Sequence, residues 1–246
     1  MLFRSAACFA SRTTGFGDGL IICLIARTGR PAIHPLYFSR RPRQYGAMKI
    51  LILFAHPRLS GSVVQKSMLS AIAGLDGVTV HDLYAAYPDF AIDVKREQEL
   101  LLAHDIIVLQ HPFYWYSAPA IIKEWLDLVL QNSWAYGPGG TKLAGKFMLS
   151  AVSIGGSAEA YAQSGRNRFE VAELLTPFNQ TAYLCNMAWL TPFAIHAGRR
   201  MTAENLSART EAYRDVIVGL RDHCIDPLAM LADGFTLPPA FNAKAA

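Results

Sequence analysis

The sequence predicts an α/β protein in which five parallel strands form one sheet covered by helices on both faces, a three-layer sandwich. Short runs rich in Ile, Leu and Val recur without polar alternation, which is typical of strands buried on both faces. A segment with helical spacing of apolar residues follows each run, and alternating strands and helices favour parallel pairing. Five such units fit the strand order 2-1-3-4-5, with ligands bound beyond the carboxyl ends of the strands.

The first two units and the third strand follow in chain order. The run KILILFA (49–55) predicts the first strand, and the helix 63–75 follows with a serine just before it as the N-cap. The second strand (77–84) starts after an Asp-Gly turn, and the helix 93–104 begins with Asp93 as its cap. The run DIIVLQ (105–110) predicts the third strand.

The second half of the chain continues the alternation. The helix 119–132 has proline in its first turn and one apolar stripe. The run FMLSAVSI (147–154) predicts the fourth strand, and a helix is expected over 168–186. The segment LTPFAIH (190–196) predicts the fifth strand, and the last helix is expected over 202–224.

Residues 1–47 differ in composition from the remainder of the chain. They carry seven Arg and one Asp, a net charge of +6, whereas the other 199 residues carry 16 basic and 18 acidic side chains, a net charge of −2. We expect 1–47 to be a disordered or mis-annotated extension preceding a true start at Met48, or alternatively a targeting segment. We expect 48–224 to form one domain and 225–246 a loose tail. Because the folded part is not basic, nucleic acid is not an expected partner.

The loop after the first strand suits a phosphate. A helix N-terminus offers free backbone N–H groups and a positive dipole end, and Ser60, Ser62 and His56 add side-chain donors. The loop lacks GxxxxGK[ST] and GxGxxG, so neither nucleoside triphosphate cleavage nor a standard dinucleotide site is predicted. The alternative is an ordinary capped helix start.

Four consecutive aromatic residues, Phe113 to Tyr116, follow the third strand directly after Pro112. Consecutive side chains cannot all face one core, so some of them line another surface. Aromatic faces stack on planar conjugated rings, and Tyr114 and Trp115 are the expected wall of a flat pocket. The alternative is that two of the four are core residues and two lie in an interface.

The loop after the fourth strand contains two consecutive glycines, Gly155 and Gly156, which allow a tight turn with its N–H groups toward a ligand. It is not a nucleophile elbow, because Glu159 stands where GxSxG requires glycine. The three loops follow strands that meet at one crevice. A ribityl phosphate joined to a flat three-ring system fits such a crevice, which predicts a flavin.

The stretches ILFAHPRLSGSVV, IVLQHPFYWYSAPAIIKEWLD, WAYGPGGTKLAGK and SIGGSAEAYAQSG resemble the flavodoxin-like NAD(P)H:quinone oxidoreductase family. The resemblance covers roughly residues 48–222 and includes the subgroup of ancillary proteins of the glutathione-gated potassium-efflux system. It implies a flavodoxin-like fold, FMN or alternatively FAD, and NAD(P)H as co-substrate. It also implies two-electron transfer to a quinone by a ping-pong mechanism.

The same resemblance implies a homodimer, with Trp134 and Tyr136 near the partner subunit, in the cytoplasm or on the cytoplasmic face of the inner membrane. There the protein would regulate a potassium/proton antiporter. The alternative is a non-catalytic, flavin-binding regulatory subunit of that antiporter. An electron-transfer flavodoxin fits less well, because those proteins are typically acidic and lack the long aromatic loop.

Residue by residue, the resemblance implies a flavin site and one catalytic tyrosine, Tyr161, with no metal site. The implied cofactor-binding residues are His56, Ser62, Val63, Val64 and Gln65 for the phosphate and ribityl chain, Pro112, Phe113, Tyr114, Trp115 and Tyr116 around the isoalloxazine, and Ser153, Ile154, Gly155 and Gly156 at its polar edge. Two positions depart from the family pattern. Gln65 replaces a frequent Asn, and Asn167 replaces the His of many quinone reductases, so Tyr161 alone is expected to stabilise charge on the quinone.

Overall fold

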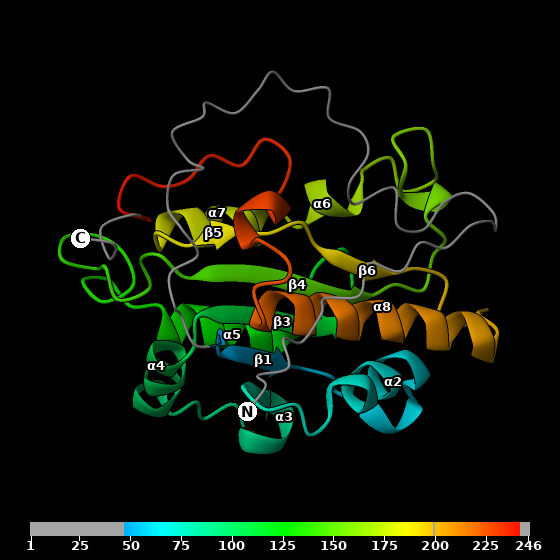
Figure 1. Ribbon diagram of the computed structural model, residues 1–246, viewed down its shortest axis with the longest axis horizontal. Helices are drawn as coiled ribbons and strands as arrows, with labels where there is room; N and C mark the ends of the chain where they lie inside the picture. The colour runs from blue at the N-terminus through cyan, green and yellow to red at the C-terminus, as the bar shows by residue number, and fades with distance from the viewer. Residues whose placement is uncertain (1–46, 199, 242–246) are drawn as a thin grey trace, which may run out of the picture. The chain divides into compact units, whose positions relative to one another are not determined.

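A parallel sheet forms the centre of the described chain, residues 47–198 and 200–241 of a computed structural model. Its strands are ordered β2 (Val78–Asp82), β1 (Ile50–Phe54), β3 (Ile106–Pro112) and β4 (Phe147–Ser153), and each neighbouring pair is parallel (Figure 1). The next position is shared by β5 (Ala188–Trp189) and β6 (Phe193–Ile195), which both pair in parallel with β4. The predicted order 2-1-3-4-5 is therefore confirmed. The expectation for the N-terminal extension lies outside the described residues.

The fifth strand is split in two, where the sequence predicts a single strand over 190–196. Pro192 lies in the gap and has no N–H to donate to the ladder. The amide of Thr191 turns away from β4 and donates to the carbonyl oxygen of Met230 at 2.7 Å. The hydrogen bond made at this interruption therefore connects the sheet to the C-terminal segment.

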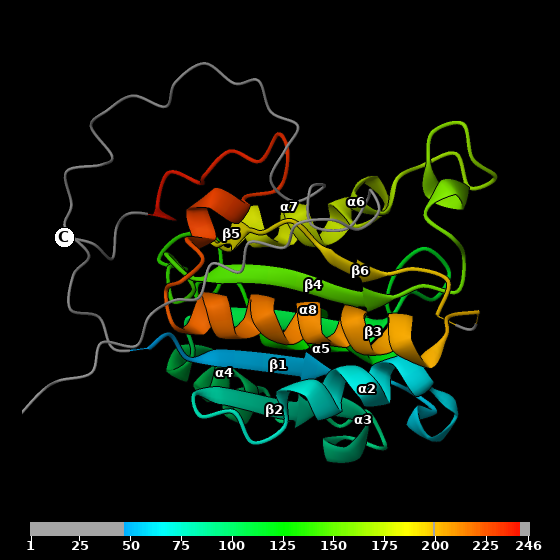
Figure 2. The same cartoon turned by 45° about the vertical axis from the view of Figure 1, so that its right-hand side comes forward.

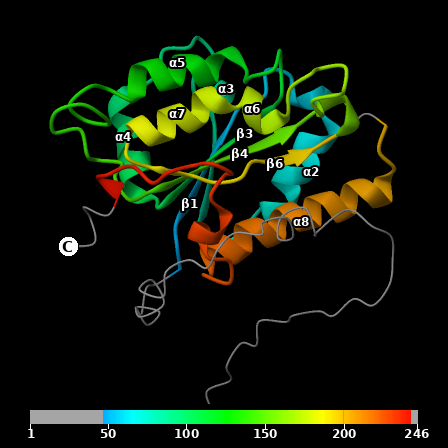
Figure 3. The same ribbon diagram turned by 90° about the horizontal axis from the view of Figure 1, so that it is seen from above.

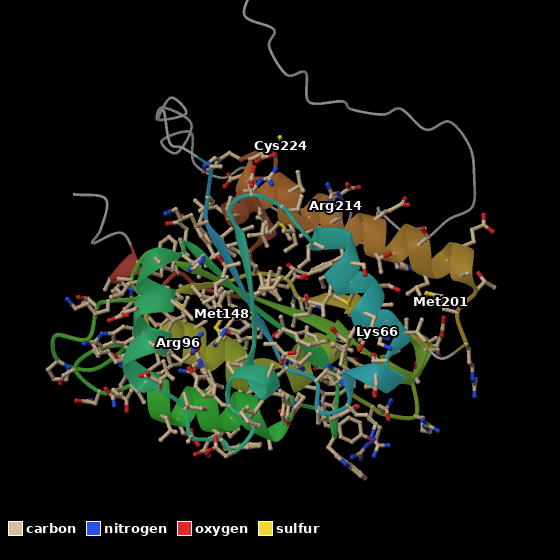
Figure 4. All side chains as sticks on the ribbon, turned by 90° about the horizontal axis from the view of Figure 1, so that it is seen from below. Lys66, Arg96, Met148, Met201, Arg214 and Cys224 are labelled. Carbon is tan, nitrogen blue, oxygen red and sulfur yellow. The ribbon has the colours of Figure 1, made fainter. Side chains whose placement is uncertain are left out.

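Helices cover both faces of the sheet, as Figure 3 shows from above. One face carries α2 (Val63–Ile72) and α8 (Ala203–Arg221), and the other carries α3 (Leu83–Ala86), α4 (Val94–Ala103), α5 (Ala120–Val129) and α7 (Thr176–Leu184). On α8, Arg214 donates to the carbonyl oxygen of Ala71 at the end of α2 at 2.6 Å, which ties the two helices together (Figure 4). None of the helices within the described ranges is long and apolar enough to cross a bilayer.

Alternation along β1 produces two separate cores. Ile52 and its even-numbered neighbours pack with α2 and α8, including Tyr213 of α8. Leu53 and its odd-numbered neighbours pack on the opposite face, with Trp125 of α5 at the centre. All five residues of β1 are fully buried, as expected for a strand covered on both faces.

The elements expected from the sequence lie within about three residues of their predicted bounds, except around the fifth strand and the helix before it. That helix, expected over 168–186, is divided into α6 (Val171–Leu174) and α7 because Pro177 occupies the first turn of α7. The short helix α3 is not predicted by the sequence.

The C-terminal segment differs from the expected loose tail over its described part. Residues 227–230 form a short 3-10 helix, and Leu231 forms an isolated bridge with Leu190. The ring of Phe241 is buried and lies 5.6 Å from that of Phe147, edge to face. This segment therefore covers the apolar edge of the sheet beside the split fifth strand.

Candidate functional site

The loops after β1, β3 and β4 meet at one edge of the sheet. The carboxyl ends of these strands point the same way, and the segment between β4 and α6 projects beyond them (Figure 2). The His56 ring lies 6.1 Å from that of Tyr114, edge to face, which joins the first loop to the second. The ring of Phe113 lies 5.8 Å from that of Tyr161, which joins the second loop to the third.

The first loop ends in a capped helix. The Oγ of Ser62 accepts from the amide of Gln65 at 3.3 Å, so the Ser62 hydroxyl hydrogen is left to donate elsewhere. Nδ1 of His56 accepts from the amide of Arg58 at 3.1 Å, which places the proton of the neutral ring on Nε2. Burial lowers the pKa of His56, partly opposed by its backbone and by Asp82. His56 is therefore a neutral donor beside the helix N-terminus.

The side chain of Gln65 lies beneath the site and is fully buried. Its Nε2 donates to Oγ of Ser153 at 3.0 Å, and its Oε1 accepts from Nε2 of Gln110 at 3.0 Å. Tyr213 of α8 completes the chain by donating to Oε1 of Gln110 at 2.8 Å. These hydrogen bonds fix Gln65 beneath the two loops, and its contact with a ligand, which the sequence resemblance implies, stays a prediction.

Val63 and Val64 take different positions in the first turn of α2. Val63 is two-thirds exposed, whereas Val64 is buried against Gly198. A Cβ at Gly198 would lie 2.5 Å from Cγ2 of Val64, so a glycine is required for this close approach. Val64 can therefore reach a phosphate only through its backbone.

The aromatic segment after β3 forms a strained turn. Only Phe113 is buried, while Tyr114 and Tyr116 are nearly half exposed and Trp115 is 92% exposed. The amide of Ser117 donates to the carbonyl oxygen of Tyr114 at 3.0 Å across a turn whose central residues have φ of 49° and 64°. This is a type I′ turn, which normally has Asn or Gly at those positions. Holding Trp and Tyr there costs stability, and such strain is concentrated at functional sites.

Two residues at the carboxyl ends of the strands complete the site, Tyr161 and His196. Their rings lie 5.9 Å apart, and burial raises the pKa of Tyr161. Nδ1 of His196 is buried and has no hydrogen-bond partner, and burial is the main cause that lowers the pKa of this imidazole. Gly156 makes room for the tyrosine, since a Cβ there would lie 2.9 Å from Cε2 of Tyr161.

His196 is the site residue that sequence reasoning missed. In the sequence it is an isolated histidine with no metal-ligand spacing around it. The available signal was its place at the end of the predicted fifth strand, because the loop that follows a strand next to β4 reaches the same edge. The amide of Ala197 donates to the carbonyl oxygen of Gly156 at 2.8 Å, which fastens this loop to the glycine turn.

The geometry of these residues fits a flavin. The capped N-terminus of α2 suits a phosphate, and the exposed faces of the aromatic turn suit a flat conjugated ring. No atom lies within 4 Å of a Cβ built on Gly155, so the glycine turn leaves room for the edge of such a ring. The unpartnered Nδ1 of His196 is a further polar group that a ligand can satisfy.

Another hollow begins at Ser117 and Ala118, just after the aromatic turn, and extends away from the glycine turn. It has a volume of about 590 Å³ and is lined by α5, α7 and the loop between α5 and β4. Its walls are mostly apolar, with Leu126, Phe178 and Leu184 among them, and Tyr136 closes one side. The hollow does not reach the glycine turn, so we do not assign it to the flavin.

A buried carboxylate lies outside the site, between β2 and α5. Glu97 is fully buried and accepts hydrogen bonds from Tyr87 at 2.6 Å and Trp125 at 2.8 Å, and it lies 2.8 Å from Nε2 of His81. Burial opposes its charge, but these partners outweigh burial and hold the pKa of Glu97 below its usual value. This cluster stabilises the fold beneath β2.

Comparison with known proteins defines the class to which the chain belongs. Residues 48–217 match the flavodoxin-like fold family, and the chain belongs to that family. Among curated relatives, the glutathione-regulated potassium-efflux system ancillary protein KefG of Escherichia coli O1:K1 is 47% identical over 167 residues, 68% of this chain and 91% of the relative. The resemblance to ancillary proteins is therefore confirmed. Within that subgroup the sequence resembles KefF, and this relative carries the name KefG.

Two solved structures add to this comparison. General stress protein 14 from Treponema denticola, in complex with FMN, is 40% identical with a TM-score of 0.64, and the match covers 72% of this chain and 99% of that one. The NADPH-quinone reductase from P. pentosaceus is 34% identical with a TM-score of 0.64, and the match covers 69% of this chain and 97% of that one.

Proposed function

We propose that this protein is a flavin-dependent NAD(P)H:quinone oxidoreductase. The observation that carries the proposal is the strained aromatic turn, exposed beside Tyr161 and His196 where the phosphate loop and the glycine turn meet. The FMN complex of one relative and the quinone reductase name of another support it.

FMN is the proposed cofactor. Ser62, His56 and the first amides of α2 hold its phosphate and ribityl chain, the aromatic turn stacks on its ring, and Gly155 and Gly156 contact the polar edge. FMN is favoured over FAD because the segment between the glycine turn and α7 is too short for an added adenine-binding module. When bound, the flavin supplies the two-electron chemistry between NAD(P)H and a quinone.

Tyr161 stabilises the reduced quinone directly, and His196 supports it by positioning the Tyr161 ring. Burial keeps the phenol of Tyr161 protonated, so it donates a hydrogen bond to a quinone oxygen. Burial also favours the neutral form of His196, and its ring packs at a tilt of 60° against that of Tyr161 and holds it in place. His196 therefore takes part in the role expected of Tyr161 alone. NAD(P)H and quinone use the same slot in turn, which gives ping-pong kinetics.

We further propose that the protein acts in the cytoplasm as an ancillary regulator of a potassium/proton antiporter at the inner membrane. The identity to KefG supports this proposal. A homodimer is also proposed, in which the apolar hollow between α5 and α7, with Tyr136 at its side, is covered by the second subunit. The alternative is a flavin-binding regulatory subunit without catalysis.

Initial-rate kinetics test the enzyme proposal. With flavin-loaded protein, double-reciprocal plots at several quinone concentrations are expected to give parallel lines, and Tyr161→Phe is expected to lower kcat while retaining the flavin. Intersecting lines contradict the shared slot. If no NAD(P)H is oxidised although flavin is bound, and deletion of the gene changes potassium efflux, the regulatory alternative holds.

A further inference from the structure

A second hollow of about 340 Å³ lies beside the aromatic turn. It is formed by residues 166–169, which precede the N-cap of α6, by Leu174 of α6 and by Tyr116. Its polar walls are two guanidinium groups, Arg166 and Arg168, and its apolar wall is the ring of Phe169. A cavity of this size accommodates one nucleoside-sized group.

The hollow and the aromatic turn of the proposed redox site share one residue, Tyr116. Tyr116, the second strained residue of the aromatic turn, lines it and donates from Oη to Oδ1 of Asn167 at 3.3 Å. Arg166 is near enough to Tyr161 to lower the pKa of that phenol, against the larger effect of burial. The hollow therefore lies beside the part of the site that Tyr116 and Tyr161 line.

Its arginines are available to an anion. Neither takes part in the ion pairs found in the described part of the chain. Arg168 lies over the ring of Phe169, 5.7 Å from the centroid, on a backbone held at a φ of 63°. The neighbouring acidic pair, Glu170 and Glu173, is engaged in the capping box at the start of α6. Two exposed guanidiniums are thus presented on one strained loop.

We propose that this hollow binds the adenosine 2′-phosphate end of NADPH, so that the protein selects NADPH over NADH. The inference rests on the proposed function, which places the nicotinamide over the flavin. Guanidinium groups match a phosphate in both charge and geometry, and Phe169 offers a face for the adenine ring. NADH presents only a hydroxyl at this position, which leaves the two cations without a counter-charge.

Nucleotide binding to the flavin-loaded full-length protein tests the proposal. Isothermal titration calorimetry with 2′,5′-ADP is expected to show at least tenfold tighter binding than with 5′-AMP. Arg166→Ala and Arg168→Ala are each expected to weaken 2′,5′-ADP binding by about tenfold and to leave 5′-AMP binding unchanged. The matched control is Arg96→Ala, an exposed arginine on α4 (Figure 4), which is expected to change neither.

Kinetics give a second readout. The arginine variants are expected to raise KM for NADPH and to leave KM for NADH unchanged. Equal affinity for 2′,5′-ADP and 5′-AMP, or equal losses for NADPH and NADH, would overturn the proposed subsite. Absence of any nucleotide oxidation would contradict the proposed function instead, and the calorimetric comparison would still decide whether the hollow binds the 2′-phosphate.

Discussion

Replacing Trp115 with glycine is expected to relieve strain in the aromatic turn, so that the apoprotein becomes more stable while it binds the flavin more weakly. Trp115 has a φ of 49° and is 92% exposed, so its side chain contributes little buried area. A left-handed backbone costs a non-glycine residue about 1–2 kcal/mol, whereas glycine loses about 0.5–1 kcal/mol more entropy on folding. Trp115→Gly is therefore expected to raise the free energy of unfolding of the apoprotein by roughly 0.5–1 kcal/mol.

The same substitution is expected to weaken flavin binding. Loss of one stacking face is worth about 0.5–1.5 kcal/mol, which is roughly a 2- to 12-fold increase in Kd. Urea unfolding of the apoprotein and fluorescence titration with FMN measure the two effects. The control is His223→Gly, which places glycine at another left-handed residue (φ of 57°), at the end of α8 and far along the chain from the turn, and should leave Kd unchanged. A Trp115→Gly variant that is less stable and binds FMN normally would refute the reasoning.

Three further predictions concern buried groups. Glu97→Gln is expected to lower the free energy of unfolding by about 2–4 kcal/mol. Because the pKa of Glu97 is lowered in the folded protein, its charge stabilises the fold above the unfolded pKa of about 4.3, and this stabilisation is lost as pH falls below that value, so the variant should flatten the acid limb of a urea-unfolding pH profile. Exposed Glu99→Gln is the control and should change neither the free energy of unfolding nor the profile. Because burial lowers the pKa of His196, activity is expected to be full at pH 7 and to fall only below about pH 6.5. His196→Gln should reduce kcat and remove that fall. An unchanged pH profile of the variant would contradict a role for the ring. Gly156→Ala is expected to displace Tyr161 and to lower kcat measured at saturating FMN, and unchanged kcat would show that the contact is not needed.

The sheet order was predictable because parallel strands buried on both faces consist of continuous apolar residues that are recognisable in the sequence. The expected strand at 147–154 corresponds to β4, where six of seven residues are buried. The fifth strand was less predictable, because its split depends on a contact between Thr191 and Met230, far apart in the chain. Local patterns carry no information about such a contact, although Pro192 was a local sign of interruption.

The site was predictable as a set of loops but not as a set of side chains. Parallel topology brings His56 and Tyr114 together, as expected for loops at one edge. Whether a side chain faces the ligand or the core depends on packing, so the buried amide of Gln65 could not be distinguished from a ligand contact. His196 was missed for a related reason, because two helices and two strands separate it in the chain from its partner Tyr161.

The most direct test of the central claim is an absorbance spectrum of the purified full-length protein after titration with FMN. The account predicts stoichiometric binding, bleaching of the flavin bands by NADPH and their recovery on addition of a quinone. A protein that takes up neither FMN nor FAD would contradict the proposed enzyme while leaving the fold unaffected.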